Sequence, residues 1–531
     1  MSPCEGERRL GWIVGESTPR TSLVLFSDSS EVPRVGTYVV AESPAGCVFG
    51  MIESVTAGNR LLTEDVTSPE SVEGLIRAIR ENPSISPSYV KGVVRWLSME
   101  GSLVQRGSVE LPKVPPRPGV EVFSASRDLL IKVFSPPQAS SFKGEEGADN
   151  REKARPWVPL GTLMTEESIE YSIDVNRLTR HLAVLAITGG GKSNTVCVLS
   201  KEIVMKHRGT VVIFDMHGEY GNLGLSEDSV NRSPPAINPL MMSFSELLEL
   251  ARVPENATNQ QRALRQAFDS VWEEFSSNKL KFDDSRTFID ALLGKLNDMN
   301  EEGARGAYNR VLDVRDNYGD VLSHGVPLDL KKVIAPRRLN VFDLSEADEN
   351  AADAIVSHYL RRLLSERKAW KHGRGGYPIP VFVVIEEAHV LIPAHGMTLT
   401  KYWASRIARE GRKFGVGLIV VSQRPRNVDP DVLSQTNNKI ILRIVEPQDI
   451  RYVQDASEEL SEDLASILPS LNPGEAVVIG SMVKLPAVIK VNRCEGKRSG
   501  GDIDVVGEWR KWGEEQETQV REGEKRLQEL L

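Results

Sequence analysis

The segment that most constrains the fold of this chain is Ala186-Ile-Thr-Gly-Gly-Gly-Lys-Ser193, which directly follows the apolar run Leu182–Ala186. A short apolar strand, a glycine-rich loop and a Lys-Ser pair form the pattern of a phosphate-binding P-loop. The glycines let backbone N–H groups converge on phosphate oxygens, and the N-terminus of the following helix adds its positive dipole end. The pattern predicts a nucleotide site in an α/β fold.

We expect ATP and Mg²⁺ as the ligands of this loop. Lys192 is predicted to reach the β- and γ-phosphates, and the Ser193 hydroxyl is predicted to ligate Mg²⁺. Ala186 replaces the first glycine of the G-x-x-x-x-G-K-[ST] pattern, and we expect this change to be tolerated because the position ends the strand. The alternative is a glycine-rich turn with a chance lysine. The predicted nucleotide-binding residues are Thr188, Gly189, Gly190, Gly191, Lys192, Ser193 and Asn194.

Carboxylates follow two other apolar strands. Glu386 and Glu387 come directly after Val381–Ile385, and Asp215 follows residues 211–214. In a hydrolase, the first acid of such a pair holds the water shell of the metal, and the second orients and polarises the attacking water. We therefore predict Glu386 as a metal residue and Glu387 as catalytic. The pair argues against a metabolic kinase, although solvated acids at a strand end are the simpler alternative.

Five motifs occur in a fixed order along the chain: Thr-Gly-Gly-Gly-Lys-Ser-Asn-Thr195, Asp-x-His-Gly-Glu-Tyr220, Glu-Glu-Ala-His389, Gly411-Arg-Lys-Phe-Gly415 and Val421-Ser-Gln-Arg-Pro425. In this order they resemble the HerA/FtsK superfamily of ring-shaped DNA-pumping ATPases, and within it the archaeal HerA helicases. The resemblance covers most of the chain. It implies a homohexameric, ATP-driven DNA translocase and helicase with double-stranded DNA in its pore. It also implies a NurA-like nuclease partner and a role in DNA end resection for recombinational repair.

The resemblance also implies roles for single residues. Gln423, which follows the strand 416–422, matches a sensor of the γ-phosphate, and Asp215 matches the family's acid near the metal or the attacking water. Arg412 matches an arginine finger that a neighbouring subunit inserts into the site. Arg180 resembles an additional arginine supplied by the same subunit. Three other arginines compete for these two roles: Arg406, Arg409 and Arg424.

Composition limits the remaining possibilities. The chain has 531 residues and a net charge of −9, so it holds more than one domain and is no basic nucleic-acid coat. DNA contacts must then be local, and Lys401 in the segment 395–401 is a candidate pore residue. No apolar run approaches a membrane span, which favours a cytoplasmic protein. The four cysteines are scattered, which suits a reducing compartment without a metal cluster: Cys4, Cys47, Cys197 and Cys494.

The chain divides into three predicted parts. Residues 1–160 contain short strands between turn residues and are expected to form a small β-barrel, with a helix at 71–80 and a linker at 140–156. Residues 161–500 are expected to form a RecA-like ATPase domain with a largely parallel sheet and a helical insertion at about 240–335. Residues 501–531 are expected to brace a neighbouring subunit.

Two other functions fit parts of this pattern. A conjugation- or secretion-type ring ATPase would share the motor motifs, although the N-terminal barrel and the lack of membrane anchors disfavour it. A nucleotide-binding scaffold without hydrolysis would need no paired glutamates. ATPase assays with and without double-stranded DNA would separate these possibilities.

Overall fold

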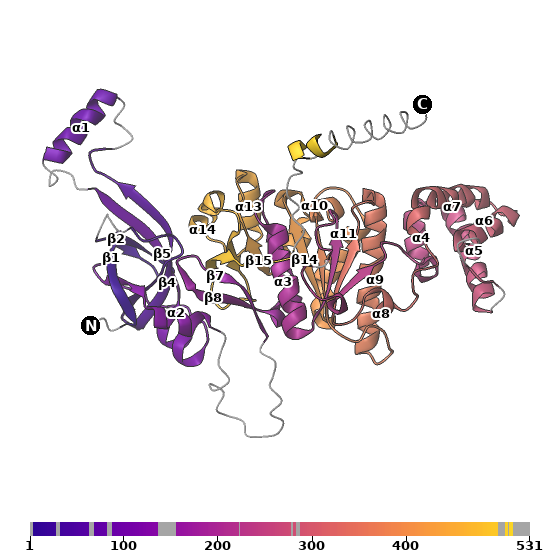
Figure 1. The fold of residues 1–531 in the computed structure, drawn as a ribbon, viewed down its shortest axis with the longest axis horizontal. Helices are drawn as coiled ribbons and strands as arrows, with labels where there is room; N and C mark the ends of the chain where they lie inside the picture. The colour runs from indigo at the N-terminus through magenta and orange to yellow at the C-terminus, as the bar shows by residue number, and fades with distance from the viewer. Residues whose placement is uncertain are drawn as a thin grey trace, which may run out of the picture.

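The computed structural model describes residues 4–27, 32–62, 68–81, 88–135, 156–221, 223–277, 280–282, 287–496, 505–507 and 509–512. These residues form a barrel at one end of the molecule, a large sheet with flanking helices in the middle and a helical insertion at the other end (Figure 1). The α/β fold class, with a RecA-like core, a helical insertion and a preceding β-barrel, is confirmed. The linker expected at 140–156 lies outside the described residues except for Pro156.

The N-terminal barrel is closed, with the strand order β1-β2-β5-β4-β3-β6. Side chains alternate between its interior and solvent, as in β2, because successive residues of a strand point to opposite faces. The short strands expected from the sequence are present, and the helix expected at 71–80 is α1 (Pro69–Glu81). The barrel strands are β1 (Gly6–Ser17), β2 (Thr21–Phe26), β3 (Tyr38–Ser43), β4 (Gly46–Gly58), β5 (Tyr89–Met99) and β6 (Glu121–Ala125).

The barrel is joined to the motor by specific contacts. The Tyr38 hydroxyl donates to the carbonyl of Pro486 at 2.9 Å. Nearby, Ser461 donates to the buried carboxylate of Glu53 at 2.8 Å. Burial raises the pKa of Glu53, and the Ser461 hydrogen bond opposes that rise. Helix α2 (Arg127–Phe134) adds apolar side chains to the same core, so barrel and motor share packed surface.

The motor sheet has eleven strands among the described residues, in the order β11-β12-β10-β13-β14-β9-β15-β16-β17-β7-β8. Seven of them, from β11 to β15, are parallel, as expected from alternating strands and helices. The strands are β7 (Trp157–Leu163), β8 (Glu166–Asp174), β9 (Leu182–Leu185), β10 (Thr210–Asp215), β11 (Val230–Ser233), β12 (Leu339–Asp343), β13 (Val381–Ile385), β14 (Val416–Ser422), β15 (Asn438–Ile441), β16 (Glu475–Ile479) and β17 (Ala487–Val491).

The remaining strands depart from the expected parallel arrangement. β16, β17, β7 and β8 pair antiparallel with their neighbours. The short connections between β16 and β17 and between β7 and β8 make these two pairs hairpins. β17 pairs with β7, which brings residues 161–163 next to residues 489–491. The segment just after the barrel therefore completes the motor sheet.

Helices cover the parallel part of the sheet and form the insertion. Within the expected helical insertion, apolar stripes at 264–275 and 288–296 pack as core, with Phe268 and Phe288 in edge-to-face contact. The helices are α3 (Lys192–His207), α4 (Phe244–Leu250), α5 (Thr258–Ser276), α6 (Phe288–Asp298), α7 (Ala304–Tyr318), α8 (Leu330–Val333), α9 (Glu349–Lys371), α10 (Ala388–Leu391), α11 (Leu399–Phe414), α12 (Pro430–Gln435), α13 (Pro447–Asp455) and α14 (Glu462–Ser466).

The expectation of scattered free thiols is wrong. Cys4 pairs with Cys47, and Cys197 on α3 pairs with Cys494 after β17, with Cα–Cα distances of 5.6 and 6.0 Å. Sequence spacing could not show this, because 43 and 297 residues separate the partners and only the fold brings them together. The cysteines therefore no longer argue for a reducing compartment.

Most of the expected bracing segment, 501–531, lies outside the described residues. Within the part that is described, Trp509 and Trp512 are 71% and 65% exposed. Among the described helices, none is both long and apolar enough to cross a bilayer.

Candidate active site

The carboxyl ends of the parallel strands form one edge of the motor sheet, which we call the P-loop edge. Strand register aligns Asp215 with Asp343, Phe214 with Ile385, and Ser422 with Leu185. Each of these strands is buried, so the first polar residues after it emerge at the same level. Open α/β sheets bind ligands at this edge.

The P-loop connects β9 to α3 with the conformation that its glycines allow. Gly189 and Gly191 have φ angles of 74° and 108°, which side-chain-bearing residues rarely adopt. A Cβ on Gly190 would lie 2.9 Å from the Ala186 Cβ, so the loop also needs a small residue there. Ala186 is fully buried directly after the strand β9. This position holds a methyl group in place of the first glycine of the P-loop pattern.

The side chains of the loop are held by local hydrogen bonds. Lys192 Nζ donates to the carbonyl oxygens of Ala186 and Ile187 at 3.3 and 3.4 Å. Thr188 donates to Gln423 Oε1 at 2.5 Å, so the predicted γ-phosphate sensor lies directly beside the loop. The Asn194 amide instead contacts the segment after β17, donating to the Asn492 carbonyl at 2.8 Å. Any contact of Asn194 with nucleotide would therefore come from its backbone.

Glu386 lies at this edge in a buried, acidic environment. Its carboxylate is 4% exposed and accepts a hydrogen bond from the Tyr220 hydroxyl. Burial raises the pKa of Glu386 to about 8, and the nearby Asp215, Glu219 and Glu387 add to the rise. Glu386 and Ser193 both interact with the Tyr220 hydroxyl, and a carboxylate and a serine hydroxyl are oxygen ligands of the kind that Mg²⁺ prefers. The residues present thus fit a magnesium ion held near Ser193 and Glu386.

Glu387 stands next to Glu386 in an unusual backbone conformation. Its φ angle of 43° is left-handed, a strain that in non-glycine residues is concentrated at functional sites. Oε1 lies 3.4 Å from His217 Nε2, and Oε2 lies 3.1 Å from His389 Nδ1. Oε2 is buried and has no hydrogen-bond partner among the described residues, as expected for an acceptor that would hold a water.

Asp215 is buried and orders the loop that follows it. Its carboxylate accepts from the backbone N–H groups of His217 and Glu219 at 3.2 Å and of Tyr220 at 2.9 Å. Burial raises the pKa of Asp215, and these hydrogen bonds oppose that rise. In this structure the acid therefore acts on the loop rather than facing the P-loop directly.

Arg180 and Arg412 lie at the opposite edge of the sheet, which we call the arginine edge. Arg180 precedes β9, and Arg412 lies in the last turn of α11, just before β14. The two are close enough that Arg412 lowers the pKa of Arg180, after the larger effect of burial. The four residues of β9 alone span roughly 13 Å between Arg180 and the P-loop. This position is incompatible with the expected same-subunit role of Arg180.

The competing arginines are also distinguished by position. Arg424 follows Gln423 at the P-loop edge, and its charge, after burial and Glu387, contributes to the shifted pKa of His389. Arg406 pairs with Glu410 on α11 at 3.0 Å and lies over the Trp403 ring. Arg409 faces Asp431 on α12. Only Arg424, of these three, therefore lies near the P-loop of its own chain.

Lys401, the candidate pore residue, is paired with other groups of its own chain. Lys401 Nζ donates to the carbonyl of Pro393 at 2.8 Å and lies 2.9 Å from Asp429 Oδ2. The exposed side chains of the segment 395–401 are His395 and Met397, the latter at 75%. Lys401 therefore stabilises this segment, and a role in DNA contact is not supported.

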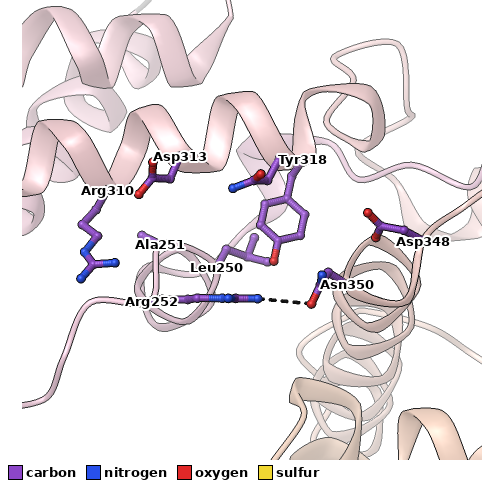
Figure 2. A pocket seen from close by; sticks show the side chains of 9 residues that line it. Leu250, Ala251, Arg252, Arg310, Asp313, Tyr318, Asp348 and Asn350 are labelled. Carbon is purple, nitrogen blue, oxygen red and sulfur yellow. Dashed lines mark hydrogen bonds between the residues drawn. The ribbon is translucent and has the colours of Figure 1, made fainter.

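A separate polar cavity of about 260 Å³ lies between the insertion and the start of α9 (Figure 2). Arg252 donates to Asn350 across it at 3.2 Å, and Asp348 caps α9 by accepting from the Ala351 N–H at 2.7 Å. Two arginines and two aspartates line it, so its charges balance and favour no particular ligand. We assign no function to it.

Sequence reasoning did not give a role to Tyr220 or His217. Both lie in the polar Asp-x-His-Gly-Glu-Tyr220 motif, whose position directly after a buried strand was the available signal. The carboxylates that these two residues contact follow the neighbouring strand β13. Tyr220 and Glu386 are 166 residues apart in the sequence, so the motif by itself does not indicate their contact.

A parallel sheet with a P-loop, paired acids after β13 and a glutamine after β14 defines a RecA-like P-loop ATPase. The chain belongs to the HerA family of helicases: residues 158–363 match the family described as "Helicase HerA, central domain", and residues 10–101 match the HAS barrel domain. The resemblance inferred from the five motifs is thereby confirmed.

Similar proteins span nearly the whole chain. It is 40% identical to the DNA double-strand break repair helicase HerA of Sulfurisphaera tokodaii, covering 95% of this chain and 97% of that one. It is 39% identical to the same-named helicase of Saccharolobus solfataricus, covering 94% and 96%. Among solved structures, VirB4 of Thermoanaerobacter pseudethanolicus is 18% identical with a TM-score of 0.50, covering 66% of this chain and 99% of that one. This last likeness shows the fold alone.

Proposed function

We propose that this protein is an ATP-driven DNA translocase and helicase that acts in DNA double-strand break repair. The observation that carries the proposal is the Glu386–Glu387 pair beside the P-loop, in a chain that matches repair helicases along almost its full length. A non-hydrolysing scaffold would have no use for a buried carboxylate oxygen, Glu387 Oε2, that makes no hydrogen bond among the described residues. HerA family membership also disfavours a conjugation- or secretion-type ATPase.

In the proposed reaction, each chain grips the triphosphate of ATP at its P-loop edge. Backbone N–H groups of the loop and Lys192 would bind the phosphates, and Ser193 and Glu386 would hold Mg²⁺, which supplies charge neutralisation when bound. Glu387 would orient and polarise the attacking water, and Gln423 would contact the γ-phosphate. Arg424 replaces Arg180 as the proposed cation from the same chain, because it lies at this edge.

The arginine edge would complete the site of a neighbouring chain. Arg412 is the proposed finger in trans, and Arg180, which lies beside it, would act in trans as well. This arrangement requires a closed ring in which the two edges face each other, and we propose a homohexamer. The C-terminal segment, with its two exposed tryptophans, would brace the neighbouring subunit.

The proposed substrate is double-stranded DNA in the central pore, with a NurA-like nuclease as partner in end resection. The repair role follows the similarity to DNA double-strand break repair helicases, and the duplex in the pore and the nuclease partner rest on the family resemblance alone. A DNA substrate implies a cytoplasmic location.

The test is ATP turnover by purified protein with and without linear double-stranded DNA, together with native mass. We expect a hexameric mass and DNA-stimulated turnover. A truncation before Asp502 should shift the mass toward smaller species, whereas an unchanged mass would contradict bracing. A monomer at working concentration, or an absence of turnover under every condition, would refute the proposed function.

A further inference from the structure

We infer that the loop Asp215–Tyr220 positions both acids of the active site: Tyr220 orients Glu386, and His217 orients Glu387. The inference deepens the proposed function and rests on it. Neither residue would touch the reacting atoms, so both are positioning residues.

The loop is rigid enough for this task. Three backbone N–H groups within it point at the Asp215 carboxylate, which is 1% exposed and lies at the end of a central strand. Gly218, at φ 70°, makes the turn, with Asp343 and Ser345 of the neighbouring strand end close by. A charged acceptor that collects several N–H donors holds a loop in a single conformation.

Tyr220 connects the two groups that would hold the metal. Its side chain is fully buried, its hydroxyl donates to Glu386 Oε1, and it forms a second hydrogen bond with the Ser193 side chain. One hydroxyl thus links the acid after β13 to the first turn of α3. A tyrosine that only filled the core would need one partner, and a backbone carbonyl would serve, as Leu485 does for Tyr171 at 2.9 Å.

His217 approaches the second acid from the same loop. Its Nε2 lies 3.4 Å from Glu387 Oε1, while His389 stands 3.1 Å from Oε2 on the other side. Glu387 is thereby flanked by two imidazoles and keeps its left-handed backbone. His217 contacts Oε1, while Oε2, although 3.1 Å from His389 Nδ1, makes no hydrogen bond among the described residues and can therefore accept one from a water, as general-base action needs.

The first experiment measures how the binding of a fluorescent ATP analogue depends on the Mg²⁺ concentration. This measurement does not require turnover. Tyr220→Phe removes one hydroxyl and keeps the ring, and we expect the half-saturating Mg²⁺ concentration to rise about 10-fold. Tyr171→Phe, which also removes a buried hydroxyl, is the matched control and should leave that concentration unchanged. An unchanged Mg²⁺ requirement in Tyr220→Phe, or an equal rise in both variants, would overturn the role of Tyr220.

The second experiment separates kcat from KM. His217→Ala should lower kcat for ATP roughly 10-fold with KM changed less than about 2-fold, because only the orientation of Glu387 is lost. His217→Gln, whose amide reaches a similar position, should restore most of kcat. A wild-type kcat in His217→Ala, or no rescue by glutamine, would overturn the role of His217. If the wild-type protein has no turnover, the proposed function fails, while the Mg²⁺ binding experiment still decides the role of Tyr220.

Discussion

The P-loop edge and the arginine edge of the motor sheet differ in the charged side chains that they carry. The P-loop edge carries the buried acids Asp215 and Glu386 and the partly buried Glu387, whereas the arginine edge carries Arg180 and Arg412. A single chain therefore carries both halves of the proposed ATPase site but keeps them a strand's length apart. The difference teaches that oligomerisation, rather than folding of one chain, would bring the arginines to the phosphates.

The largest effect is expected at the P-loop edge. Lys192→Ala removes the side-chain cation of the loop, and we expect ATP turnover to fall by at least ~10³-fold, measured as phosphate release. Lys206→Ala, on the exposed end of the same helix, is the control. Turnover above a tenth of wild type in Lys192→Ala would mean that the phosphates bind elsewhere.

The arginine edge is tested in mixed rings. Arg412→Ala should lower turnover by ~10³-fold or more, as for other arginine fingers, and Arg406→Ala on the same helix should not. Mixing Arg412→Ala with Lys192→Ala should restore activity, because some interfaces then pair an intact P-loop edge with an intact arginine edge. A mixture no more active than its components would show that the two edges do not meet.

Glu387→Gln separates binding from hydrolysis at the P-loop edge. The amide keeps the size of the side chain but cannot accept a proton, so turnover should fall by ~10²–10⁴-fold while ATP remains bound. Filter binding of labelled ATP alongside phosphate release measures both. Normal hydrolysis would exclude Glu387 as the base.

The smallest effect is expected from the disulfide behind the P-loop edge, which ties α3 to the segment after β17. Losing a crosslink costs ~2–4 kcal/mol of stability, so Cys197→Ser should lower the melting temperature by several degrees. The same substitution should leave turnover at low temperature unchanged. A melting temperature that stays unchanged under both oxidising and reducing conditions would contradict the crosslink.

Much of the P-loop edge could be predicted because its residues follow strands that the sequence marks clearly. Glu386 and Gln423 each follow a strand directly, and Lys192 ends the loop that follows another strand; parallel strands bring such positions to one edge. The same logic, applied to Arg180, would have located it at the other edge, since it precedes its strand. The expected same-subunit role of Arg180 came instead from the family resemblance.

Local patterns in the sequence determined the P-loop, the strands and helices, and the family, since each depends on neighbouring residues and on their period along the chain. The tertiary structure alone decided which distant side chains meet: Tyr220 with Glu386, Cys197 with Cys494, and β17 with β7. The physical reason is that such contacts depend on strand order and connection, which bring together residues that sequence separation leaves unrelated.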